Sequence, residues 1–217
     1  MPNWCSTYIV IHTTRKSPNA TISLEKLHSE IKNVISGESR IENGFGPNWL
    51  GNVADKFNVY SDKLSCRGQI IEISDINYVD NTQDERIHDY FTMQIEEAWS
   101  PDSPQWIKEL ILPKFIGLGI EYSAEEPGDD IFINTDVYGI YISERYLIDM
   151  DIGLPKSKFS EEYEYFESDE DLISYINKKT GEEFETVYQV EKYLSGLQEA
   201  NPDAYIGFHE FIDDIGF

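Results

Sequence analysis

The chain has 217 residues, of which 40% are hydrophobic and 13% aromatic, a composition that argues against a disordered protein. Its 17 basic and 41 acidic residues give a net charge of −24, which argues against direct binding to nucleic acid or to an anionic membrane. No stretch approaches the roughly 18 apolar residues of a membrane span, and the N-terminus has no signal-peptide pattern, so we expect a cytoplasmic protein.

The beginning of the chain predicts a strand, a helix and a long loop. Residues 4–12 are mostly β-branched and aromatic, which is typical of a strand. Apolar residues then recur at helical spacing, with Ser23 as the expected N-cap and Gly37 just beyond the helix. The apolar positions of this helix are Leu24, Leu27, Ile31, Val34 and Ile35. Residues 37–63 are rich in Gly and Asn and predict a long loop, a feature that is often functional.

Two strands, a second helix and a further strand follow. Alternating side chains predict strands at 69–74 and 91–96. Ser103 followed by Pro104 favours the start of a helix. The expected apolar face of this helix is Trp106, Ile107, Leu110 and Ile111, and the next strand is marked by Leu118, Ile120 and Tyr122. This order predicts an α+β, ferredoxin-like split βαβ sandwich, in which an antiparallel sheet carries two helices on one face.

The character of the sequence changes near residue 150. We predict a ferredoxin-like α+β domain over 1–150 and an acidic, mostly helical C-terminal extension over 151–217, packed on that domain. Further elements are expected in this order: strands at 130–135 and 138–147, a helix between Ser168 and Gly181, and a helix near 186–199.

Negative charge is concentrated toward the end of the chain. Residues 1–120 hold 16 acidic and 11 basic residues, whereas residues 121–217 hold 25 acidic and 6 basic residues, a net charge of −19. The densest run, residues 161–171, has seven acidic residues in eleven. Such a surface can attract a basic protein or cations, or it can serve solubility alone, and the sequence leaves both interpretations open.

Four short motifs within residues 1–135 are similar to those of one protein family. In chain order they are Met1-Pro2-Asn3-Trp4-Cys5-Ser6, then Arg40-Ile41-Glu42-Asn43 with Phe45-Gly46 and Trp49, then Ala98-Trp99-Ser100-Pro101, and last Tyr122 with Glu126-Pro127-Gly128. Together they resemble the YubB-type ferredoxin-like domain of uncharacterised bacterial, plasmid and phage proteins. The chain departs from the family pattern at Thr7, Gly44, Leu50 and Asp102. The resemblance implies the same fold and a phage or plasmid association, but no activity and no iron–sulfur cluster.

These motifs place three tryptophans on predicted loops or strand ends. Trp4, Trp49 and Trp99 could converge on one pocket or interaction surface, because exposed aromatic side chains anchor interfaces. Glu42 and Asn43 would supply its polar groups. Alternatively, the tryptophans close one end of the sheet, and Asn43 satisfies loop backbone.

The rest of the sequence offers no clear catalytic, metal or cofactor motif. Adjacent carboxylates such as Glu96 and Glu97 are expected by chance in so acidic a chain. The run from Asp149 has its glycine at the fifth instead of the sixth position of an EF-hand loop and Ser160 in place of the last glutamate, and the four histidines form no zinc pattern. Cys5 and Cys66 are expected to be reduced thiols, with Cys5 buried in a strand. We therefore predict no catalytic residue, no metal site and no cofactor.

The leading interpretation is a non-enzymatic module that binds a basic protein partner through its acidic surface. In its concrete version the module is a nucleic-acid charge mimic that occupies the basic groove of a nucleic-acid-binding protein. The acidic residues expected at that contact are Glu126, Glu164, Glu167, Asp169, Glu170 and Asp171. The alternative is a small-molecule-binding protein or an enzyme with a pocket beside Trp4, Trp49 and Trp99.

Overall fold

The computed structural model of the chain describes residues 3–42, 45–79, 85–151, 159 and 162–213. The chain divides into two compact α+β units, unit 1 (Met1–Asp136) and unit 2 (Val137–Phe217). This division lies earlier than the boundary at residue 150 expected from composition, because β6 (Tyr146–Asp151) pairs with two strands that follow it. Within the described residues, no helix is both long enough and apolar enough to cross a membrane.

The described strands of unit 1 form a five-stranded antiparallel sheet in the order β2-β3-β1-β4-β5. Their bounds are β1 (Trp4–Thr13), β2 (Gly68–Ile73), β3 (Tyr90–Ala98), β4 (Leu118–Glu126) and β5 (Ile131–Asn134). The central strand is β1, in which Ile9 lies opposite Met93 of β3 and Tyr122 of β4. The strand expected at 130–135 is β5, and it extends the sheet by pairing with β4.

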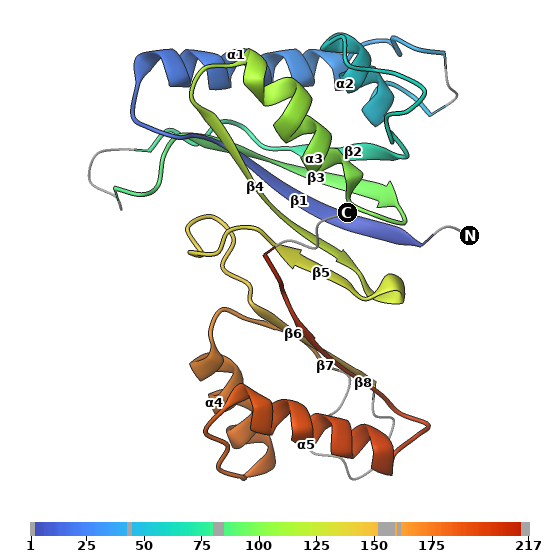
Figure 1. Cartoon of the computed structure of the whole chain (residues 1–217), viewed down its shortest axis with the longest axis vertical. Helices are drawn as coiled ribbons and strands as arrows, with labels where there is room; N and C mark the ends of the chain where they lie inside the picture. Colours follow the sequence, from blue (N-terminus) through green and yellow to red (C-terminus); the bar gives the residue numbers. More distant parts are fainter. Residues whose placement is uncertain (1–2, 43–44, 80–84, 152–158, 160–161, 214–217) are drawn as a thin grey trace. The chain divides into compact units, whose positions relative to one another are not determined.

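The helices of unit 1 cover one face of its sheet (Figure 1). They are α1 (Pro18–Ile35), α2 (Leu50–Lys56) and α3 (Asp102–Trp106), and α3 continues as the π turn η1 (Ile107–Ile111) and the 3-10 turn η2 (Leu112–Lys114). Alternate strand residues meet the apolar stripe of α1 in the core, which includes Ile9, Ile11, Leu24, Leu27, Ile31, Phe91, Met93 and Ile95. Burying each such side chain contributes roughly 1.5–3 kcal/mol, so this core holds the layers together.

The prediction of a long loop with little regular structure over 37–63 misses one element, because this region contains α2. The buried side chains of Leu50, Val53 and Ala54 lie on one side of this helix, and Phe57 continues the same stripe. This i, i+3, i+4, i+7 spacing is a helical signal, but the segment is only 7 residues long and follows several Gly and Asn residues. Tertiary packing on the core stabilises a helix this short.

Two details of the other helices also differ from the prediction. Helix α1 begins at Pro18 with Ser17 as its N-cap, rather than after Ser23, because proline is well suited to the first helical position. In the helix that starts with α3, Leu110 is 40% exposed, although it was assigned to the apolar face. The π turn changes the residue spacing, and Leu112 is buried instead.

The described strands of unit 2 form an antiparallel sheet in the order β7-β6-β8, with two helices on one of its faces (Figure 1). The further elements are β7 (Glu162–Phe166), α4 (Asp169–Thr180), α5 (Val187–Ala200) and β8 (Tyr205–Glu210). The two helices are confirmed, and Ser168 and Gly181 bound α4 as predicted. Strand β7 was missed because it lies inside the acidic run 161–171, so the C-terminal part is a mixed α+β unit.

Candidate functional site

A cavity of about 770 Å³ opens in unit 1, where β1 and β2 begin and β3 ends. Small-molecule sites usually measure roughly 300–1,000 Å³. Five aromatic side chains line this cavity, which we call the aromatic pocket: Trp4, Phe45, Trp49, Tyr60 and Trp99. The rest of its lining comes from residues 61–69 and from Ala98. The structure therefore brings the three tryptophans of the sequence motifs together around one space.

The exposure of these rings distinguishes a pocket from a closed end of the sheet. Trp4 is 53% exposed, Trp99 is 45% exposed and Phe45 is 69% exposed, whereas a plug would bury its rings. Trp49 is half-buried and packs against the core of unit 1. The pocket thus combines one ring that is packed on the core, Trp49, with rings that are accessible to a ligand.

Two of the tryptophans are placed by neighbouring strand ends. Trp4 is the first residue of β1 and lies opposite Ala98, the last residue of β3. Trp99 follows at once, and its backbone N–H donates to the carbonyl of Asn3 at 3.0 Å. Trp99 has a φ of 79°, a left-handed conformation that costs on the order of 1–3 kcal/mol for a non-glycine residue.

The third tryptophan is held by the edge of the sheet. Trp49 is extended, immediately precedes α2 and forms a β-bridge with Gln69 of β2. The N–H of Ile70 donates to the carbonyl of Asn48 at 2.9 Å. This bond joins the segment before α2 to β2 and so fixes the backbone position from which the Trp49 side chain extends.

Packing then fixes the orientation of the Trp49 ring. Its centroid lies 6.1 Å from that of Phe45 and 5.9 Å from that of Tyr60. Its indole also covers the backbone of Gly51, where an added Cβ would lie 2.3 Å from the ring. A side chain at position 51 would therefore displace Trp49.

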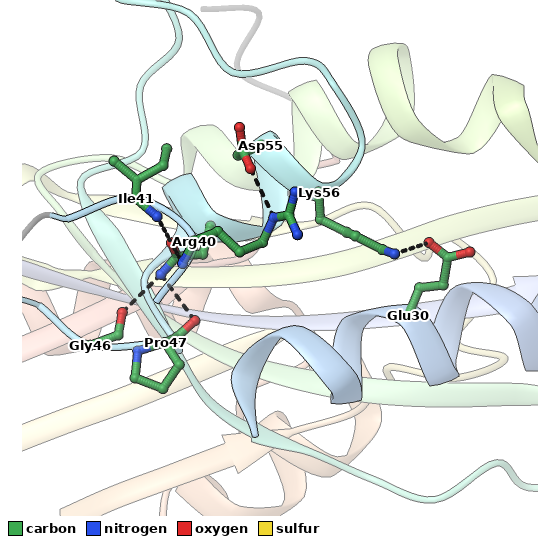
Figure 2. Close-up of polar contacts among 8 residues, drawn as sticks. Glu30, Arg40, Ile41, Gly46, Pro47, Asp55 and Lys56 are labelled. Atoms are coloured by element: carbon green, nitrogen blue, oxygen red, sulfur yellow. Dashed lines mark hydrogen bonds and ion pairs between the residues drawn. The ribbon is translucent and has the colours of Figure 1, made fainter. Parts of the chain in front are cut away.

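A buried amide holds the loop that carries Phe45 to the pocket. Asn52 of α2 is fully buried, and its side-chain oxygen accepts the N–H groups of Arg40 and Ile41, both at 2.9 Å. Its NH₂ group donates to the carbonyls of Gly46 at 2.9 Å and Pro47 at 3.2 Å. Figure 2 shows these contacts converging between the two ends of the loop. Asn52 thereby uses its full hydrogen-bonding capacity on one loop.

Two ion pairs at the surface of α2 support the same arrangement (Figure 2). Arg40 Nε lies 2.8 Å from Asp55 Oδ2, and Lys56 Nζ lies 3.2 Å from Glu30 of α1. Partly exposed pairs of this kind contribute about 0–1 kcal/mol each. The ion pairs orient the loop and α2, whereas the four hydrogen bonds of Asn52 contribute more to fixing the loop on the helix.

A buried carboxyl group lies against the pocket lining. Glu97 of β3 is 2% exposed. It accepts the backbone N–H of Ser103 at 2.8 Å and the hydroxyls of Ser103 at 2.7 Å and Thr7 at 3.5 Å. Burial raises the pKa of Glu97 to about 8, although the hydrogen bonds from Ser103 oppose this shift. An added Cβ on the lining residue Gly68 would lie 2.8 Å from Glu97 Cγ, so the Glu97 side chain lies directly behind this part of the pocket lining.

From the sequence alone, Glu97 is one of two adjacent carboxylates, with Glu96, that chance explains in so acidic a chain. The alternation of buried residues at 91, 93 and 95 was the signal that could have identified it, because position 97 falls on the same face of β3. Ser103, expected at the start of the helix, lies in the first turn of α3 and uses its N–H to contact Glu97.

The two cysteines are buried thiols, as predicted for Cys5. Burial raises the pKa of Cys5 to about 12 and that of Cys66 to about 11, and the nearby Glu97 adds to both shifts. Cys66 lines the aromatic pocket. At neutral pH both side chains are thiols rather than nucleophilic thiolates.

Three predicted polar site residues do not join the described pocket lining. Glu42 is exposed on the loop before the pocket, and Asn43 lies outside the described residues. Glu126 is 4% exposed, and its carboxylate accepts the N–H groups of Gly128, at 3.3 Å, and Asp129. It therefore caps a 3-10 turn, η3 (Pro127–Asp129), at the end of β4.

The remaining acidic candidates lie in unit 2, on β7, just after it and in the first turn of α4: Glu164, Glu167, Asp169, Glu170 and Asp171. All five are exposed. Asp169 accepts the hydroxyl of Tyr146 at 2.6 Å, and Glu167 accepts that of Ser143 at 2.9 Å. The N–H of Asp171 donates to the N-cap residue Ser168. Part of this acidic run therefore supports local structure.

Several lining residues were not predicted as site residues. Phe45 and Tyr60 complete the ring of aromatic side chains, and Asp62 and Arg67 supply charges of opposite sign. Arg67 Nη2 lies 3.9 Å from Asp102 Oδ2. Phe45, Tyr60 and Asp62 come from the predicted loop over 37–63, and Arg67 lies between this loop and the predicted strand at 69–74, so sequence periodicity does not place any of the four side chains.

Among the described residues, no group of three or more His, Cys, Asp or Glu side chains could hold a metal ion. Comparison of the chain with protein-family models, with curated proteins and with solved structures finds no match.

Proposed function

We propose that unit 1 is a ligand-binding module whose aromatic pocket holds a small organic molecule. The observation that carries this proposal is the convergence of five aromatic side chains on one cavity of about 770 Å³. Four of them, including Trp4 and Trp99, are 40–69% exposed. Contiguous exposed apolar patches in soluble proteins usually mark interaction sites.

The chemistry of the lining favours binding over catalysis. The Cys66 thiol is neutral near pH 7, because burial raises its pKa to about 11. Arg67 is partly compensated by Asp102, and Asp62 is an exposed carboxylate. Among the described lining residues, none forms the paired nucleophile and base that covalent catalysis requires.

The fold and family of unit 1 belong to the same proposal. The strand order β2-β3-β1-β4, with helices on one face, supports a ferredoxin-like split βαβ arrangement to which β5 has been added. The motifs that resemble those of YubB-type domains support membership of that family and a phage or plasmid association, and the free thiols of Cys5 and Cys66 support a cytoplasmic location. Neither the fold nor the family would define the ligand.

A thermal-shift screen of small molecules tests the proposal. A ligand at 100 times its dissociation constant stabilises the folded state by about 2.7 kcal/mol, which raises the melting temperature measurably. We expect hits with wild type and with Tyr188→Ala, which removes a 69% exposed aromatic side chain from unit 2. The same hits should be lost with Trp99→Ala. Equal stabilisation of both variants, or no stabilising compound at all, would contradict the proposal.

A second proposal is an acidic protein-interaction surface on unit 2, in the form of a nucleic-acid charge mimic. It is favoured by the 19 acidic and 6 basic residues of this unit, a net charge of −13, and by the exposure of Glu164 and Glu170. A basic partner retained on the immobilised protein should be released by rising salt and by added duplex DNA. Retention that resists both would exclude the charge mimic.

A further inference from the structure

The aromatic pocket offers π faces in more than one orientation. Phe45 and Trp49 are tilted by 31°, and Trp49 and Tyr60 meet edge to face at 68°, so these rings do not form a single flat stack. Trp4 and Trp99 add two half-exposed indoles to the lining. Tryptophan has the aromatic side chain that attracts cations most strongly. A ligand in this pocket would therefore contact several electron-rich faces.

The charge around the pocket also favours a cation. Unit 1 holds 22 acidic and 11 basic residues, a net charge of −11. The lining contains the exposed carboxylate of Asp62, and the charge of Arg67 is partly offset by Asp102 at 3.9 Å. An anionic ligand would approach against the field of the whole chain, whereas a cation would be attracted.

We infer that the aromatic pocket binds a small organic cation that carries a methylated ammonium group, of the choline type. This inference rests on the proposed function and names the ligand class of the same pocket. A quaternary ammonium group has no N–H donor and spreads its charge over its methyl groups, so ring faces and one carboxylate can recognise it without hydrogen bonds. The lining provides this combination of groups.

Two probes separate the effect of charge on binding from the effect of shape: choline, and its neutral isostere in which a tert-butyl group replaces trimethylammonium. Calorimetric titration of the full chain should give a dissociation constant for choline at least about tenfold lower than that for the isostere. Trp99→Leu keeps an apolar side chain but removes a π face, so it should weaken choline binding and narrow this ratio. Asp62→Asn should also weaken choline binding, and Arg67→Gln should strengthen it, because each changes one charge in the lining.

Equal affinity for the two probes would overturn the inference but leave the binding module in place. If neither probe binds, the inference is also wrong, and the thermal-shift screen alone then decides the proposed function. A choline-to-isostere ratio unchanged in Trp99→Leu would overturn the role assigned to the rings. A trimethyllysine peptide that binds more tightly than choline would assign the pocket to a protein partner and overturn the small-molecule ligand.

Discussion

Replacing Glu97 by glutamine tests whether a neutral carboxyl group lies beside the aromatic pocket. The Glu97→Gln variant keeps the shape of the side chain and an oxygen that can accept the N–H of Ser103, but it cannot ionise. Burial raises the pKa of Glu97 from 4.5 to about 8 in the folded protein. Between these pH values the folded state holds a proton that the unfolded state has lost, so raising the pH destabilises wild type.

Each pH unit in this window changes the free energy of unfolding by about 1.4 kcal/mol. The stability that the raised pKa of Glu97 contributes is fully present below about pH 4.5 and is lost as the pH rises to about 8. The total loss over this range is roughly 5 kcal/mol. Denaturant titration should therefore find the variant close to wild type near pH 5 and more stable by several kcal/mol near pH 8.

Glu96→Gln is the matched control, since it removes an exposed carboxylate from the neighbouring position of β3. Surface substitutions of this kind usually change stability by less than about 0.5 kcal/mol. The charged group that acts on Glu97 is Asp102, and it stays in both variants. A stability difference between wild type and Glu97→Gln that does not vary with pH would refute the reasoning, because it would mean that Glu97 is already ionised near pH 5.

Three further substitutions test how the pocket is built. Asn52→Ala removes four hydrogen bonds to one loop, so we expect a loss of about 2–4 kcal/mol in denaturant titration; a loss below about 1 kcal/mol would show that water replaces the amide. Gly51→Ala would ordinarily stabilise a helix by about 1 kcal/mol, but the new Cβ would meet the Trp49 indole at 2.3 Å. We therefore expect altered tryptophan emission and weaker choline binding, and unchanged emission would contradict the contact. Trp99→Gly relieves a φ of 79°, so the variant should be at least as stable as wild type while losing choline binding; strong destabilisation would show that the indole serves packing.

Long periodic segments are the part of the fold that the sequence predicts. The stripes of α1, α4 and α5 and the alternation in β3 each extend over 9 residues or more, so local pattern identifies them. By contrast, α2 has 7 residues and β7 has 5, and neither is long enough to outweigh its Gly-rich or acidic surroundings. Their conformations depend on packing and strand pairing within each unit.

The candidate site also contains residues that the sequence predicts and residues whose roles it does not predict. Trp4 and Trp99 could be selected from sequence because they flank predicted strands, and the antiparallel register then brings them together. The roles of Asn52 and Glu97 could not, because they depend on which distant backbone groups reach each side chain. Glu126 was selected from a motif, but its carboxylate caps the following turn. A motif residue on one chain segment can therefore serve local structure rather than the pocket.

The most direct test of the central claim, that the three tryptophans form one ligand site, is to follow the indole N–H signals of the protein by NMR during a choline titration. The chain has four tryptophans, and Trp106, which is 4% exposed in the core, is an internal reference. We expect the signals of Trp4, Trp49 and Trp99 to shift together with a single dissociation constant while that of Trp106 stays in place. Pocket signals that remain fixed, or that shift with different constants, would contradict it.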